Sequence, residues 1–127
     1  MAKQVSIFDH LLTVSKPILK IGKEAREPEL LGDIITACAE EKAFLFIEGE
    51  SFTVLKPIHT AGKKKLLIWV AFSPEGNAYE KFMPYILERD KEIEAVELEF
   101  QTAVPEISNY ISKKNWTKSY EVWNLEV

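Results

Sequence analysis

The sequence is poor in the residues that build covalent and metal-bound frameworks. Its 127 residues include a single cysteine, Cys38, so neither an internal disulfide nor a cysteine metal cluster can form. The two histidines, His10 and His59, lie far apart without an acidic ligand motif beside them, and we expect no metal site. Cys38 stands between two alanines in a helical pattern, which favours a buried structural thiol over the alternative, a nucleophile.

Long apolar runs and an excess of positive charge are also missing. No stretch approaches the ~20 apolar residues of a membrane span, and the first residues lead into no signal-peptide core, so we expect a soluble cytoplasmic protein. The net charge of −4 disfavours nucleic acid, whose phosphates require a clustered excess of Lys and Arg. The run Lys63–Lys65 is the exception. It indicates a solvated turn or, alternatively, a contact with a ligand phosphate.

What the sequence does contain is an ordinary globular composition, with 46% hydrophobic and 28% charged residues. This argues against disorder and predicts one domain over residues 1–127. Helical spacing of apolar residues predicts three helices in the first 92 residues. The first follows the capping-box-like segment Ser6–Asp9 and should be interrupted or kinked at Pro17, the second spans residues 28–42, and the third carries the stripe 79–87 with Pro84 inside it.

Strand patterns occupy the remaining parts of the chain. Residues 43–47 and 51–55 read as a hairpin, and residues 66–72 are apolar on both faces, as in the middle of a sheet. The period-two segment 95–100 should be a parallel neighbour of 66–72, because a helix connects the two. A short helix from Pro105 and a strand near residues 120–124 complete an α/β fold with a mixed sheet, in the order ααβββαβαβ.

The connection from the apolar strand to the third helix has the form of an anion site. It reads Ser73-Pro74-Glu75-Gly76-Asn77-Ala78. The first N–H groups of a helix lack intrahelical partners, and a glycine beside them lets a phosphate approach the backbone closely. An ordinary strand-to-helix turn is the alternative interpretation.

The strand, this loop and the element order resemble the GNAT superfamily of acyl-CoA N-acyltransferases over most of the chain. The family loop has the pattern Arg/Gln-x-x-Gly-x-Gly/Ala, to which Gly76 and Ala78 conform, whereas Ser73 replaces the Arg or Gln. The first strand of the family is absent or unrecognisable in this sequence. The resemblance implies acetyl-CoA or another acyl-CoA as cosubstrate and an amine acceptor. The implied cofactor-binding residues are Trp69, Val70, Ala71, Phe72, Ser73, Gly76, Asn77 and Ala78.

A second likeness covers Tyr110–Trp116, which resembles the family segment Tyr-x-Lys-x-Gly-Phe with the tyrosine one residue early. It implies Tyr110 as the acid that protonates the thiolate leaving group, although a tyrosine that anchors the core is the alternative. Glu99 lies on the polar face of the strand beside the cofactor strand, and we predict it as general base. A solvated carboxylate row is the alternative there, and His59 is a weaker candidate base.

Two functions stay open from the sequence. One is an acyl-CoA-dependent N-acyltransferase, and the other is a binding or structural protein with the same fold that has lost the chemistry. More narrowly, the segments 31–34, 43–46 and 67–69 resemble small phage-encoded GNAT-like proteins. Three tryptophans, Trp69, Trp116 and Trp123, are compatible with a self-association surface, although tryptophan is equally a core residue.

Overall fold

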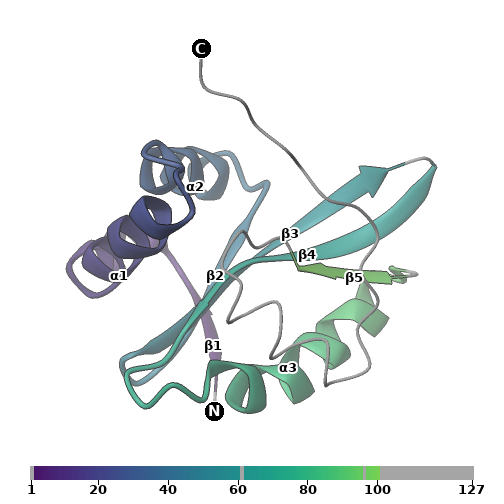
Figure 1. The fold of residues 1–127 in the computed structure, drawn as a ribbon. Coiled ribbons are helices and arrows are strands. Elements are labelled where there is room, and N and C mark those ends of the chain that lie inside the picture. The colour runs from purple at the N-terminus through teal and green to yellow at the C-terminus, as the bar shows by residue number, and fades with distance from the viewer. Residues whose placement is uncertain (1, 61, 96, 101–127) are drawn as a thin grey trace.

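The computed structural model describes residues 2–60, 62–95 and 97–100, which form a mixed α/β fold around one five-stranded sheet. Helices α1 (Leu11–Glu24) and α2 (Leu30–Ala39) cover one face of the sheet, and α3 (Ala78–Glu92) covers the other (Figure 1). The predicted α/β class with a mixed sheet is confirmed. The helix from Pro105, the last strand, Tyr110, Trp116 and Trp123 lie outside the described residues.

The sheet has the strand order β1-β2-β3-β4-β5. Strands β2 (Phe44–Glu48) and β3 (Ser51–Thr60) form the predicted antiparallel hairpin, and β4 (Lys63–Phe72) pairs antiparallel with β3. Strand β5 (Glu97–Phe100) is parallel to β4, which confirms the predicted pairing. One prediction was wrong: Lys63–Lys65 lie in β4 and pair with β3, because the hairpin extends further than its apolar part.

A short first strand corrects the expectation that this element is missing. Strand β1 (Lys3–Val5) pairs antiparallel with β2 at the edge of the sheet. Three residues are too few to show a period-two pattern, and Lys3 and Gln4 are exposed, so no apolar signal marks this strand. The segment after it is a 3-10 turn, η1 (Ile7–Asp9), in which Ser6 makes no side-chain capping bond.

Both helical prolines are tolerated within continuous helices. Pro17 lies inside α1, and Pro84 lies inside α3. Proline lacks the N–H that would bond the carbonyl four residues earlier, but Pro84 is on the exposed side of its helix, where water can hydrate that carbonyl. Helix α1 runs through Pro17 without a break, so of the two expected outcomes, an interruption or a kink, the interruption is not found.

The alternation of side chains along the strands divides the core into two layers. Leu45, Val54 and Val70 pack with α1 and α2, whereas Leu55 and Ile68 pack with Phe82 of α3. Strand β4 contributes to both layers, which explains why its sequence is apolar on both faces. This double burial fixes β4 and the start of α3 in place, and the candidate site is built on them.

Candidate functional site

A β-bulge interrupts β4 at Trp69. Val54 pairs with Val70 and the next residue, Leu55, pairs with Ile68, so β4 contains one residue more than β3 at this point. Such an insertion bends the strand and increases its local twist. The hydroxyl of buried Thr53 donates a 2.8 Å hydrogen bond to the Val70 carbonyl and fixes the backbone beside the bulge.

Strand β5 lies beside the part of β4 that precedes this bulge. Its described residues pair from Lys65↔Glu97 to Ile68↔Phe100. The indole of Trp69 is partly buried against the α1–α2 layer, with the Lys56 ammonium 4.9 Å from its ring centroid. The segment 69–72 thus begins at a bend and leads directly to the loop before α3. This edge of the sheet, at the carboxyl ends of two parallel strands, is where α/β folds characteristically bind ligands.

The loop after β4 presents its backbone at the start of α3. Pro74 to Asn77 are exposed, and the Gly76 N–H donates a 3.0 Å hydrogen bond to the Ser73 carbonyl. Gly76 has φ +75°, a left-handed conformation that glycine adopts without steric penalty. Asn77 is the N-cap residue of α3, and its side chain makes no capping bond. The first N–H groups of α3 and the positive end of its dipole therefore form a surface that favours an anion.

The Ser73 side chain differs in character from the rest of the loop. It is buried, and its hydroxyl is engaged by the side chains of Ser51, Glu75 and Asn77. Lys81, one turn into α3, also reaches Ser51 and lies close to Glu75. Sequence reasoning found neither Ser51 nor Lys81. Ser51 lies 22 positions before Ser73 and 30 positions before Lys81, and no local pattern predicts contacts over such separations.

Glu99 belongs to a row of opposite charges shared by β4 and β5. Its carboxylate lies 3.5 Å from the Lys65 ammonium, which is also 3.4 Å from Glu97, and Lys63 lies 3.4 Å from Glu97. Burial opposes the charge on Lys65, but bonds to Glu97 and Glu99 outweigh it and raise the pKa of this lysine. The Glu99 side chain is 16% exposed and that of Glu97 46%, so Glu99 is the more enclosed carboxylate of the row.

The remaining sequence candidates lie apart from this edge. His59 is exposed and pairs with Lys64 near the β3–β4 turn, at the opposite end of β4 from the loop. Cys38 lies in α2 and is partly buried rather than fully buried, and this burial raises the pKa of its thiol, as suits a structural residue. Among the described residues no group of His, Cys, Asp or Glu could hold a metal ion. Within the same residues, no helix has the length and apolarity that crossing a membrane requires.

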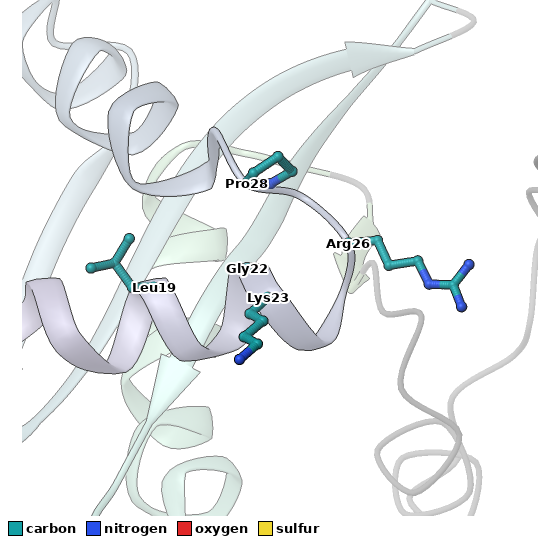
Figure 2. A pocket seen from close by; sticks show the side chains of 5 residues that line it. All are labelled: Leu19, Gly22, Lys23, Arg26 and Pro28. Carbon is teal, nitrogen blue, oxygen red and sulfur yellow. The ribbon is translucent and has the colours of Figure 1, made fainter. Parts of the chain in front are cut away.

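A pocket of about 360 Å³ lies between the end of α1 and the start of α2. Figure 2 shows its lining residues, with the Arg26 guanidinium extending away from Leu19 and Pro28. The lining contains no carboxylate, thiol or hydroxyl and none of the predicted site residues. The pocket therefore does not coincide with the edge formed by β4 and α3.

Solved structures of acetyltransferases share this architecture along the whole chain. A GCN5-related N-acetyltransferase from Ralstonia eutropha JMP134 superimposes with a TM-score of 0.68 at 12% identity, covering 99% of this chain and 97% of its own. The chain has the GNAT fold. A predicted acetyltransferase with acetyl-CoA from Clostridium acetobutylicum gives a TM-score of 0.66 at 14% identity, covering 99% of this chain and 95% of its own.

A ribosomal-protein-alanine N-acetyltransferase from Brucella melitensis biovar Abortus 2308 also matches this GNAT fold. Its TM-score is 0.66 at 9% identity, and the match covers 100% of this chain and 98% of that one. No protein-family model matches the sequence, and no curated protein matches it. The similarity to known proteins is therefore carried by the arrangement of helices and strands rather than by the sequence.

Proposed function

We propose that this protein is an acyl-CoA-dependent N-acyltransferase that transfers an acetyl or similar acyl group to an amine. The observation that supports this most directly is the coincidence of three features at one edge of the sheet. The bulge at Trp69 bends β4, the segment 69–72 continues from it, and the Gly76 loop leads into α3. A bent strand followed by an anion-binding turn suits a ligand with an amide-rich arm and a pyrophosphate.

In this proposal the acyl-CoA binds along β4. The amides of the pantetheine arm pair with the backbone of residues 69–72 as an added strand. The pyrophosphate accepts hydrogen bonds from the backbone N–H groups of Asn77 and Ala78 at the positive end of the α3 dipole, and Gly76, whose own N–H is bonded to the Ser73 carbonyl, lets it approach the backbone closely. Binding through the backbone requires no arginine or glutamine at the first loop position, which is consistent with the buried Ser73.

The chemical step needs three groups around the thioester. A backbone N–H of Val70 or Ala71 polarises the carbonyl, and Glu99 accepts the proton of the attacking amine, directly or through a water. A new C–N bond forms, the C–S bond breaks, and Tyr110 protonates the departing thiolate. Glu99 stands in β5 opposite Leu67, two residues before the bulge, and its carboxylate lies 3.5 Å from the Lys65 ammonium.

Titration of the full-length protein with acetyl-CoA in a calorimeter is the direct test. Saturable 1:1 binding is expected, and 3′,5′-ADP, which lacks the pyrophosphate and the pantetheine arm, should bind much more weakly. Transfer is then measured as release of free thiol in the presence of small amines and peptides. Binding without thiol release to any acceptor would favour a non-catalytic acyl-CoA-binding protein, and absence of binding would reject the proposal.

A further inference from the structure

A chain of hydrogen bonds connects the Lys81 ammonium to the Glu75 carboxylate through two serines. The Lys81 Nζ donates to the Ser51 Oγ at 3.2 Å, the Ser51 hydroxyl donates to the Ser73 Oγ at 3.1 Å, and the Ser73 hydroxyl donates to the Glu75 Oε2 at 2.7 Å. Lys81 also lies 3.9 Å from that same carboxylate oxygen, which closes the ring. Each group thus donates toward the negative charge, an arrangement in which the bonds strengthen one another.

The Ser73 hydroxyl has two acceptors within reach, because the Asn77 Oδ1 lies 2.6 Å and the Glu75 Oε2 lies 2.7 Å from the Ser73 Oγ. A hydroxyl donates only one hydrogen bond. When that bond goes to Glu75, the Asn77 amide presents its NH₂ group to the serine, an exchange of O and N that leaves the side chain in place. Ser51 and Ser73 are 2% and 7% exposed, so the two serines in the middle of this series of hydrogen bonds are shielded from water.

This ring lies on the β3 side of the loop. Ser51 is the first residue of β3, next to the Phe52↔Phe72 pair, and β3 and β5 flank β4 on opposite sides. The Glu75 carboxylate, bound to Ser73 and close to Lys81, is therefore directed to the side of the loop away from β5. Its side chain is 65% exposed, so only these contacts determine where its charge lies.

We propose that Lys81 is a positioning residue that, through Ser51 and Ser73, holds the Glu75 carboxylate on the β3 side of the loop and away from the phosphates of the cosubstrate. This inference rests on the proposed acyl-CoA function. A carboxylate released from the ring is one residue from Gly76 and would compete with the pyrophosphate for the N–H groups and dipole of α3. In that position Glu75 would inhibit binding.

The ionisation of Glu75 is consistent with this role. The hydrogen bond from Ser73, with smaller contributions from its own backbone and from Lys81, lowers the pKa of its carboxyl group. Glu75 is therefore negatively charged at neutral pH, and the contacts of the ring determine on which side of the loop this charge lies.

A double-mutant cycle tests the inference. Lys81→Met should weaken coenzyme A binding about 5- to 30-fold, the effect of bringing one charge to within ~5 Å of a phosphate in a partly exposed site. In a Glu75→Gln background the same substitution should change binding less than about 2-fold, because no charge remains to be held. Lys81→Arg should retain binding, and pantetheine, which has no phosphate, should bind all variants equally.

Two other outcomes of this double-mutant cycle are informative. Equal losses from Lys81→Met in both backgrounds would show that Lys81 acts on the phosphates directly, and an equal loss of pantetheine binding would show a purely structural role. Either result overturns the inference. Failure of the wild type to bind coenzyme A would instead reject the proposed function. The ring is then tested by NMR titration: a Glu75 pKa lower in the wild type than in Lys81→Met supports it, and equal values overturn it.

Discussion

Substitution of Gly76 by aspartate separates the stability of the loop from its capacity to bind an anion. Gly76 has φ +75°, and among the described residues no atom outside its chain neighbours lies within 4 Å of the position that a Cβ would occupy. The added side chain therefore meets no steric clash, and the expected loss is that of a non-glycine residue in the left-handed region, about 1 kcal/mol. For a chain of this size the melting temperature should fall by roughly 3–6 °C.

The effect on binding should be larger than the effect on stability. A carboxylate at Gly76 stands beside the N–H groups of α3 to which we assign the pyrophosphate. One unit charge about 5 Å from another contributes about 1–3 kcal/mol of repulsion between the dielectric limits of water and a partly buried site. Coenzyme A should therefore bind about 5- to 150-fold more weakly to Gly76→Asp than to the wild type.

Gly62 provides a matched control. It also has a positive φ, +78°, and no atom of the described part of the chain, its own neighbours aside, lies within 4 Å of its Cβ position. It precedes β4 at the opposite end from the loop. That end lies roughly 30 Å away, given a rise of ~3.3 Å per residue. Gly62→Asp should lose similar stability and bind coenzyme A like the wild type. Calorimetry and thermal unfolding of the three proteins measure both quantities, and equal affinities for the two variants would refute the assignment of the loop.

Other substitutions test the base, the core, the thiol and the charge row. Glu99→Gln should lower acyl transfer about 10²–10⁴-fold, whereas Glu97→Gln, which removes a pairing to the same lysine, should leave it nearly unchanged; equal turnover of the two variants would make Glu99 a structural residue. Phe82→Ala empties a fully buried position against the sheet and should cost about 3–5 kcal/mol in urea unfolding. Cys38 should react slowly with a disulfide reagent at pH 7 and fully after denaturation, and rapid reaction of the folded protein would contradict its burial. The hydrogen bond from Lys63 is the main cause of the lowered pKa of the Glu97 carboxyl group. The small stabilisation that this carboxylate gives the fold should be present above its ordinary pKa of 4.5 and be lost as the pH falls through the lowered pKa of the folded protein. Unfolding midpoints of Glu97→Gln and the wild type that still differ at about pH 3 would contradict this.

The elements that sequence reasoning predicted well are those with a local signal. The hairpin of β2 and β3, the doubly buried β4 and the helical stripe of α3 follow from apolar periodicity, because each side chain is buried or exposed according to the repeat of its own element. The parallel pairing of β4 with β5 follows from the helix that connects them. The connection from β4 to α3 that contains Gly76 is also predictable, since a glycine between a strand pattern and a helix pattern is visible in the sequence.

The tertiary structure decided the features that depend on pairing between distant residues. The bulge at Trp69 is a shift of register between β3 and β4, and the apolar sequence of β4 contains no signal that marks it. The position of Glu75 depends on Ser51 and Lys81, which meet only after β3 and α3 have packed on β4. Strand β1 exists because β2 offers it an edge, and its three residues carry no periodic signal. The sequence by itself determined which segments form the edge of the sheet to which we assign the cosubstrate. Only packing determined where the charges and the bend of this edge lie, because contacts between distant residues leave no periodic trace in the chain.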